Sequence, residues 1–441
     1  MLDITEFTEQ YDAQAEYQYK MLVWGNYTFR DNLEADSLVV VMKNVIPFLS
    51  ARYKIHFTVV VPELIKSFGQ FSNVEQVIFP FPTYCPQMRA HFDTVRFMDI
   101  LDWKRKDFDI VYSHVPEHTA QIANCIYNNT HLQPKIIGYS HWFEVKENAP
   151  YEKTLFDQAI LGTLECEELG VNSEWLKKLV IERAAEHFNQ NVCKELDRII
   201  QPHYLGVDTV RSRSTNIIPK SIIFNHRDSA YTGWSWFVPL MDKLWKKRQD
   251  FTVYTTLTQA DRWWNKRIDT PTRSEYLDLL GRMQFGVGCF QSYSAWSISV
   301  TDGLSVNTPY VLPGDLCYPE MVGTNYPYFY YDDEEFLTLC NLLLDHPSPF
   351  DTSKIAQSML WENRIATWFG GWDKIFDLPG VKNSEALPRI EALIKKHRSI
   401  TKFELLKELG NWGVQVKWTP YRNALRRSPN IKLYKDRYEY V

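Results

Sequence analysis

The stretch SIIFN, Ser221 to Asn225, predicts a buried strand in the middle of a chain of 441 residues. A polar loop and a helical segment, Trp236 to Lys246, come next, and Phe251 to Tyr254 predicts another strand. Two further strand-like runs, Phe285 to Gly288 and Thr308 to Leu312, are separated by a helical segment. Strands that alternate with helices are typical of βαβ units, so this part of the chain predicts a parallel sheet.

The first 160 or so residues show the same alternation. The strand-like runs share a core of β-branched and aromatic residues: Met21 to Trp24, Ile55 to Val61, Val77 to Phe79, Phe108 to Tyr112 and Lys135 to Tyr139. Helical patterns cover Ala35 to Leu49 and Ala120 to Tyr127. We therefore expect an α/β protein with two successive Rossmann-like sheets. Ligands of such sheets bind outside the carboxyl ends of the strands, so a cleft between two facing sheets is the expected site.

Charge is distributed unevenly along the chain. From Glu385 to Val441 there are 13 Lys and Arg against 6 Asp and Glu, a net of +7, whereas the whole chain has a net charge of −5. The other 384 residues therefore carry a net charge of −12. A basic terminal segment on an acidic body predicts an appended module with an anionic partner.

Composition indicates the cellular compartment in which the protein is expected. No run of 18 apolar residues occurs, so no spanning helix is expected, and the acidic start, Met1 to Glu6, does not resemble a signal peptide. The seven cysteines are scattered and form no C-x-x-C pair. These features predict reduced thiols, a cytoplasmic protein and no zinc cage.

Residues 171–344 carry four motifs in a recognisable order. Gly170 to Leu176 is similar to an "N-S-x-W/F" segment, and Gln201 to Asp208 to a "P-x-G-V-D" loop. Ile222 to Trp234 resembles a strand followed by an Arg loop and a "K-G" helix start. Ser294 to Val311 resembles an "E-x7-E … G-x-P-V" signature. Together they resemble the nucleotide-sugar domain of GT-B glycosyltransferases of the family 4 type.

The resemblance implies a role for several residues of this sequence. Arg227 would neutralise the departing diphosphate, and Gly233 would let backbone N–H groups approach the phosphates. Asp302 would accept hydrogen bonds from ribose hydroxyls, while Ser294 and Ser297 would approach the sugar or a phosphate. The implied co-substrate is UDP-glucose or a similar nucleotide sugar, with no tightly bound metal. Family 4 membership would favour retention of the anomeric configuration.

The sequence departs from the family pattern at three of these positions. Thr232 replaces the usual Lys, Ser294 replaces the first carboxylate of the signature, and Asp302 replaces the second Glu. A second cation for the diphosphate has three candidates between which the sequence does not choose: Lys266, Arg267 and Arg273.

Polar residues also follow three strands of the N-terminal half. Gly25 and Asn26 come after the first strand, where GT-B enzymes place a loop near donor and acceptor. His141 follows the strand that ends near Tyr139, and His114 and Glu117 follow the strand that ends at Tyr112. A His or a carboxylate at these points would orient or deprotonate an acceptor hydroxyl. The alternative for each is a hydrogen-bonded structural role.

The basic terminal segment resembles a winged helix-turn-helix. Thr401 as N-cap and Glu404 predict a capped helix over Ile400 to Gly410, and Thr419-Pro420 starts a second helix. Asn430 to Tyr434 and Arg437 to Val441 predict a β-ribbon. The candidate DNA-binding residues are Lys402, Tyr421, Arg422, Arg426, Arg427 and Lys432. Arg422, Arg426 and Arg427 share one side of the second helix, which suits a major groove.

These expectations give four regions. Residues 1–165 form a Rossmann-like acceptor domain, 166–346 a Rossmann-like nucleotide-sugar domain, 347–383 a crossover helix region broken at Gly370-Gly371, and 384–441 a DNA-binding module. A sugar-transferring enzyme with a DNA-reading module resembles bacteriophage glycosyltransferases that act on hydroxymethylated pyrimidines in DNA. The predicted partners are double-stranded DNA and a nucleotide sugar, without a membrane; the oligomeric state is open.

Three other functions stay open at this point. One is a glycosyltransferase that acts on a polysaccharide, lipid or protein, with the basic segment used for docking. A second is a non-catalytic DNA-binding protein on a GT-B scaffold, which the altered motif positions allow. The third is a sugar-phosphate enzyme of similar fold.

Overall fold

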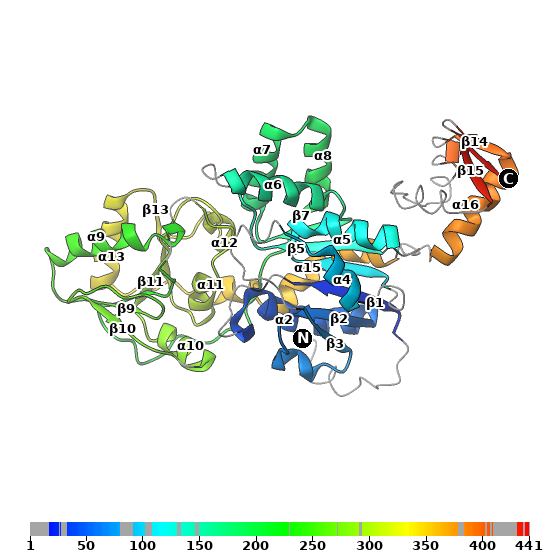
Figure 1. The fold of residues 1–441 in the computed structure, drawn as a ribbon. Helices are drawn as coiled ribbons and strands as arrows, with labels where there is room; N and C mark the ends of the chain where they lie inside the picture. Colours follow the sequence, from blue (N-terminus) through cyan, green and yellow to red (C-terminus); the bar gives the residue numbers. More distant parts are fainter. Residues whose placement is uncertain are drawn as a thin grey trace. The chain divides into compact units, whose positions relative to one another are not determined.

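The computed structural model describes residues 17–25, 27, 33–79, 91–101, 108–129, 134–145, 150–228, 230–270, 272–290, 293–377, 383–401, 404–405, 408, 430–434 and 437–440. The chain divides into two compact units (Figure 1). The first contains Met1–Gly170, Ala184–Ile200 and Gly370–Val441, and the second contains Val171–Arg183 and Gln201–Phe369. Each unit is built on its own parallel sheet.

The first sheet has seven strands in the order β3-β2-β1-β4-β5-β6-β7. Their bounds are β1 (Tyr19–Trp24), β2 (Ile55–Val61), β3 (Val74–Ile78), β4 (Ile110–Ser113), β5 (Lys135–Ser140), β6 (Glu168–Val171) and β7 (Ile200–Pro202). The pairs β2–β3, β1–β2, β1–β4 and β4–β5 are parallel. Strand order reverses between β1 and β4, and this switch point is where doubly wound sheets bind ligands.

Helices connect these strands, as parallel pairing requires. They are η1 (Leu33–Ala35), α2 (Ser37–Tyr53), η2 (Lys66–Gln70), α4 (Thr94–Leu101), α5 (Pro116–Asn129), α6 (Pro150–Thr163), α7 (Glu174–His187) and α8 (Gln190–Ile199). Helix α2 begins at Asp36, whose side chain accepts a hydrogen bond from Leu38 N at 3.0 Å, and ends at Lys54 in the left-handed conformation (φ 51°). Its apolar side packs into the core through residues such as Val41 and Val45, which are buried.

Helix α15 corrects one prediction. The structure has α14 (Ser353–Ser358) and α15 (Trp361–Asp377), so the break falls at Met359 and Leu360, and α15 runs unbroken through Gly370-Gly371. The glycine pair has a different cause: a Cβ on Gly371 would lie 1.9 Å from Glu168 Oε2, so the helix can pass β6 only without a side chain there. Asp373, two residues on, accepts hydrogen bonds from Arg52 Nε at 2.7 Å and Tyr53 OH at 2.5 Å.

The second sheet has six strands in the order β10-β9-β8-β11-β12-β13. Its strands are β8 (Ser221–Phe224), β9 (Thr252–Thr255), β10 (Asn265–Arg267), β11 (Phe285–Val287), β12 (Tyr310–Pro313) and β13 (Phe329–Tyr330). Its helices are η3 (Ala230–Thr232), α9 (Trp234–Trp245), α10 (Arg273–Gly281), α11 (Ile298–Ser305), α12 (Tyr318–Val322) and α13 (Asp333–Asp345). All neighbouring strands of this sheet pair in parallel, and strand order reverses between β8 and β11.

The C-terminal residues form a module with its own core. Helix α16 (Asn383–His397) and strand β14 (Ser399–Thr401) precede the hairpin of β15 (Ile431–Tyr434) and β16 (Arg437–Tyr440) (Figure 1). The sheet is antiparallel in the order β14-β16-β15. The buried side chains that pack together are Ile390, Leu393, Ile394, Ile400, Leu405, Ile431 and Tyr438.

The predicted helix start at Thr401 is confirmed, with one correction. Glu404 N donates to Thr401 Oγ1 at 3.2 Å and Thr401 N donates to Glu404 Oε2 at 2.8 Å, which is the expected capping box. Ile400 and Thr401, however, belong to β14. The sequence pattern missed this strand because it has only three residues and runs directly into the cap. The second predicted helix, from Thr419, lies outside the described residues.

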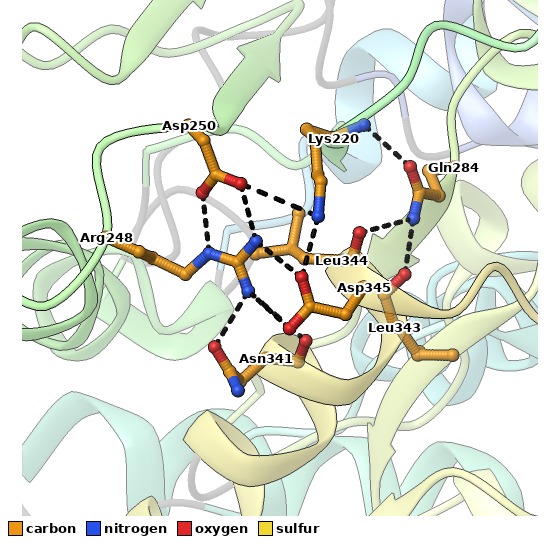
Figure 2. A network of polar contacts seen from close by, with 8 residues as sticks. All are labelled: Lys220, Arg248, Asp250, Gln284, Asn341, Leu343, Leu344 and Asp345. Carbon is orange, nitrogen blue, oxygen red and sulfur yellow. Dashed lines mark hydrogen bonds and ion pairs between the residues drawn. The ribbon is translucent and has the colours of Figure 1, made fainter.

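A polar network joins α13 to the amino ends of the second sheet (Figure 2). Lys220 precedes β8 and its Nζ pairs with Asp345 Oδ1 at 2.7 Å, while Arg248 pairs with both Asp345 and Asp250. Gln284 precedes β11 and is buried. Its Oε1 accepts from Lys220 N at 2.6 Å, and its Nε2 donates to the carbonyl oxygens of Leu343 and Leu344.

We expect replacement of Gln284 by leucine to lower the free energy of unfolding of the second unit by about 3 kcal/mol. The substitution leaves buried backbone groups without partners, and each such group costs about 1–3 kcal/mol. Asp250→Asn is the control, because the side chain of Asp250 is 51% exposed and its ion pairs with Arg248 and Lys220 are expected to contribute less than about 1 kcal/mol each. Urea unfolding followed by tryptophan fluorescence measures both, and equal effects would contradict the role of Gln284.

No helix among the described residues is long and apolar enough to cross a membrane. The six cysteines in the described part of the chain are free thiols: Cys125, Cys166, Cys193, Cys289, Cys317 and Cys340.

Candidate active site

The carboxyl edge of the second sheet brings the sequence motifs together at its switch point. Asn225 follows β8 and ties the neighbouring elements to one another. Its Nδ2 donates to Tyr276 OH at 2.7 Å and to Ser299 O at 2.8 Å, and its Oδ1 accepts from Tyr310 OH at 3.1 Å. Because its donors and acceptor are used, Asn225 is a structural residue that fixes α10, α11 and β12 around the switch point.

His226, the next residue, is buried beside β11. Its Nε2 lies 3.1 Å from the carbonyl oxygen of Val287, so the neutral ring donates a proton there. Burial lowers the pKa of His226 to about 4, and the bond to Val287 acts in the other direction. The ring is therefore uncharged at neutral pH and does not supply the second cation.

Arg227 is the exposed cation at this edge. Its Nε and Nη2 donate to Tyr231 OH at 3.0 and 2.7 Å, and its carbonyl accepts from Thr232 Oγ1 at 2.8 Å. No carboxylate pairs with Arg227 in the part of the chain that the structure describes. Thr232, which replaces the family Lys, thus shapes the loop that carries Arg227. An unneutralised guanidinium with open donors is suited to an anion.

Gly233 begins α9 and holds this loop against the end of β11. Its φ is 77°, a conformation that L-residues rarely adopt, and a Cβ would lie 1.8 Å from the carbonyl oxygen of Cys289. Any side chain at Gly233 would therefore push apart the two strand ends that form the switch point.

Helix α11 starts at the same edge. Ser297 is its N-cap and its side chain accepts from Val300 N at 3.3 Å, so that hydroxyl is engaged in holding the helix start. Ser294 is buried, with Oγ 3.3 Å from Cys317 Sγ. The N–H groups of the first turn of a helix carry partial positive charge and favour an anion.

Asp302 is buried on α11 and is paired with Arg273 at the start of α10. Arg273 Nη1 donates to Oδ2 at 2.7 Å and Nη2 to Oδ1 at 2.6 Å. Burial raises the pKa of Asp302, and the hydrogen bonds from Arg273 counteract it. Of the three candidate cations, Arg273 is the one joined to the motif carboxylate, since Lys266 lies over the ring of Tyr254 and Arg267 pairs with Asp269.

The switch point of the first sheet holds a different group. His114 N donates to Trp24 O at 2.9 Å, so His114 lies where β1 and β4 end. Its ring is buried, and neither ring nitrogen has a hydrogen-bond partner among the described residues. Burial lowers the pKa of His114, and the neighbouring His141 lowers it further, so the ring stays neutral. The ring therefore has hydrogen-bonding capacity that no described residue uses, although both nitrogens are shut off from solvent.

Of the other predicted residues of this unit, His141 lies near that ring. The rings of His141 and His114 are 6.5 Å apart, and burial lowers the pKa of His141 to about 4. Glu117 is buried in the first turn of α5. A Cβ on Gly25 would lie 2.4 Å from the side chains of Leu38 and Tyr27, so Gly25 is required by close packing. Asn26 lies outside the described residues.

We expect acid to destabilise the fold through His114 and His226. Burial lowers the pKa of His226 to about 4 and also lowers the pKa of His114, whereas in the unfolded chain a His binds a proton near pH 6.5. As the pH falls below about 6.5 the unfolded state therefore binds more protons, and His226 alone lowers the stability by about 1.4 kcal/mol per pH unit until about pH 4. His114 acts in the same direction.

Urea unfolding at pH 7, 6 and 5 measures this dependence. His226→Gln should reduce the pH slope by about one proton, while replacement of the exposed His91 by Gln should not. An unchanged slope in His226→Gln would contradict the buried neutral ring.

The candidate DNA interface is described only in part. Lys432 is exposed on β15. Arg437 on β16 is engaged in the module, because its Nε donates to Ser399 Oγ at 2.8 Å and its Nη2 lies 3.8 Å from Glu404 Oε2. The remaining candidates lie outside the described residues: Lys402, Tyr421, Arg422, Arg426 and Arg427.

Sequence reasoning missed the roles of Tyr231 and Tyr276. The spacing of Tyr231, four residues after Arg227, was a usable signal on a loop that turns into a helix. No local signal marks Tyr276, because its contact with Asn225 joins positions 51 residues apart. Among the described residues, no group of three or more His, Cys, Asp or Glu side chains is arranged to hold a metal ion.

Two parallel, doubly wound sheets in one chain, each with its switch point, define the GT-B fold. The prediction of two Rossmann-like domains with this architecture is confirmed. No protein-family model matches the sequence, and a search of curated proteins returns no match.

Solved structures with the same fold are glycosyltransferases of low sequence identity. The sucrose-phosphate synthase of Thermosynechococcus elongatus is 9% identical with a TM-score of 0.61, over 81% of this chain and 99% of that one. The lipopolysaccharide outer core galactosyltransferase WaaB is 9% identical with a TM-score of 0.56, over 80% and 99%. Anabaena HepE, in complex with UDP and glucose, is 11% identical with a TM-score of 0.51, over 80% and 100%.

Proposed function

We propose that this protein is a glycosyltransferase that moves a sugar from a UDP-sugar to a hydroxyl group. Arg227 carries the proposal: it is an exposed guanidinium at the switch point of the second sheet, oriented by Tyr231 and without an acidic partner among the described residues. The reaction breaks the bond between the sugar C1 and the diphosphate oxygen. The charge that develops on the diphosphate is the charge that a fixed guanidinium stabilises.

The neighbouring groups fit the rest of a nucleotide sugar. Gly233 and the start of α11 after Ser297 supply backbone at the switch point, and Asp302 supplies a carboxylate for ribose hydroxyls. Ser294 lies beside them on the segment that leads into α11. HepE, which shares the fold, has also been solved with UDP-glucose, which supports this class of donor.

The acceptor hydroxyl is assigned to the carboxyl edge of the first sheet. There the hydroxyl would hydrogen-bond the ring of His114, whose nitrogens are buried without a partner among the described residues, and the new bond joins the hydroxyl oxygen to the sugar C1. Its proton passes to a base, for which we propose the neutral ring of His141, with Glu117 as the second candidate. Gly25, which follows β1, and Asn26, the next residue in the sequence, are proposed to contact the donor.

The proposed acceptor is the hydroxymethyl group of a modified pyrimidine in double-stranded phage DNA. The C-terminal module supports it in two ways. Residues 385–441 carry a net charge of +7. A helix, the strand β14, a capped helix start at Thr401 and the hairpin of β15 and β16, with sheet order β14-β16-β15, are compatible with a winged helix, which binds DNA in many proteins. A base in a duplex has to leave the stack before its hydroxymethyl group can react.

The test is incubation of the full chain with UDP-glucose and duplex DNA that contains 5-hydroxymethylcytosine or 5-hydroxymethyluracil, followed by nucleoside mass analysis. We expect one added hexose on the modified base and none on cytosine or thymine. Release of UDP without DNA modification would keep the donor assignment and overturn the acceptor. No reaction and no UDP binding would overturn both.

A further inference from the structure

Arg273 stands between two carboxylates that come from different sequence motifs. Its Nη2 is 2.6 Å from Asp302 Oδ1 and 3.9 Å from Asp208 Oδ2, and its Cζ lies 5.6 Å from the ring centre of Tyr276. Asp208 closes the Gly206-Val207-Asp208 loop after β7, while Asp302 is on α11. Within the second unit, Arg273 therefore lies between Asp208 and Asp302 and is within ion-pair distance of both.

The position of Arg273 is unusual for a cation. It is the first residue of α10, where the helix dipole disfavours positive charge, and Thr272 with Glu275 already forms the capping box. Only the two acids explain a guanidinium there. The side chain of Arg273 is 47% exposed and that of Asp302 is 5% exposed, so the arginine lies on the solvent side of the buried carboxylate. Both oxygens of Asp302 accept from Arg273, so the arginine occupies the side of the carboxylate from which a ligand would approach.

We propose that Arg273 is a specificity-determining residue that moves from Asp302 to Asp208 when a ribonucleotide binds, which frees Asp302 to accept the ribose hydroxyls. This inference rests on the proposed function, because it concerns the donor nucleotide. It makes the preference for a ribose over a deoxyribose depend on Asp208, a residue that itself need not touch the ligand.

The surroundings make the exchange feasible. Asp208 is 40% exposed and already within ion-pair distance, so a small rotation of the guanidinium brings it into full contact. The hydroxyl of Tyr276 is held by Asn225 Nδ2 at 2.7 Å and also lowers the pKa of Asp302, so it remains beside the carboxylate after the arginine leaves. Two ribose hydroxyls replace two N–H donors, so the buried carboxylate stays hydrogen-bonded in both states.

Calorimetric titration of the full chain with UDP and with 2′-deoxy-UDP tests the exchange. The variants are Asp208→Asn, which removes the second partner of Arg273, and Asp302→Asn, which removes the ribose acceptor. Asp278→Asn is the matched control, because Asp278 is also on α10 and pairs with Arg211 at 2.9 Å. The thermal midpoint of each variant shows that it is folded.

We expect the wild-type chain to bind UDP about tenfold more tightly than 2′-deoxy-UDP, since a hydrogen bond to a charged group is lost. Asp208→Asn should lower the affinity for UDP about tenfold and change the affinity for 2′-deoxy-UDP by no more than about twofold. Asp302→Asn should abolish the preference for UDP. Asp278→Asn should behave as wild type. Unchanged or tighter UDP binding in Asp208→Asn, with the preference for UDP kept, would overturn the exchange alone. Absence of nucleotide binding in the wild-type chain would instead overturn the proposed function.

Discussion

Replacement of Arg227 by alanine is expected to lower the rate of sugar transfer from UDP-glucose by about 100-fold or more. Loss of one fixed donor to a developing negative charge costs about 3–4 kcal/mol in the transition state, and each 1.4 kcal/mol is a factor of ten. Arg227→Lys keeps the charge but loses the planar fork, so a loss of about tenfold is expected. UDP release in the presence of acceptor DNA measures the rate.

Two comparisons separate this effect from a general loss of structure. Arg262→Ala removes another exposed arginine of the same unit, one that pairs with Asp242 at 3.1 Å, and should leave the rate unchanged. Tyr231→Phe removes the hydroxyl that orients Arg227 and should cost a factor of about three, because the charge remains. A rate within twofold of wild type for Arg227→Ala would show that the diphosphate is stabilised elsewhere.

The triple replacement of Arg422, Arg426 and Arg427 by alanine is expected to weaken binding to duplex DNA at least about tenfold. If each arginine neutralises one phosphate, the slope of log affinity against log salt should become less steep by about 2.7, at 0.9 for each contact. Transfer to hydroxymethylated DNA should fall at subsaturating DNA, because less enzyme is bound. UDP binding should be unaffected, since none of the three arginines is among the proposed donor-binding residues.

The control for this prediction removes three positive charges at another place in the chain. Lys243, Lys246 and Lys247 are exposed at and after the end of α9, and their triple replacement by alanine should leave the salt slope as in the wild-type chain. Equal losses in the two triple variants would mean that DNA is held by overall charge. No loss in the arginine variant would remove the C-terminal module from the acceptor assignment.

Much of the sheet architecture could be predicted because its strands carry their own signal. Ile55 to Val61 was predicted with the bounds of β2, and Ser221 to Asn225 extends one residue beyond β8, because such β-branched and aromatic runs fit a buried parallel strand. The edge strand β10 (Asn265–Arg267) was missed: its residues are polar and its strand form depends on pairing with β9. Gly370-Gly371 was misread as a break because the cause, the approach of Glu168, is far away in the sequence.

In the candidate site, too, local motifs could be predicted from the sequence, whereas contacts between distant residues could not. The motif residues Arg227, Gly233 and Asp302 could be named from order and spacing, since the motifs follow particular strands. The choice of Arg273 over Lys266 and Arg267 required the structure, because the contact of Arg273 with Asp302 spans 29 residues. Likewise, the sequence pointed to His114 as one of three polar groups, but only the fold leaves both of its ring nitrogens open.

The most direct measurement of the central claim is a crystal structure of the protein with bound UDP. We expect the diphosphate beside Arg227 and the start of α11, with the ribose next to Asp302. UDP bound at another place, or a chain that takes up no UDP at millimolar concentration, would contradict the assignment of the donor site to the switch point between β8 and β11.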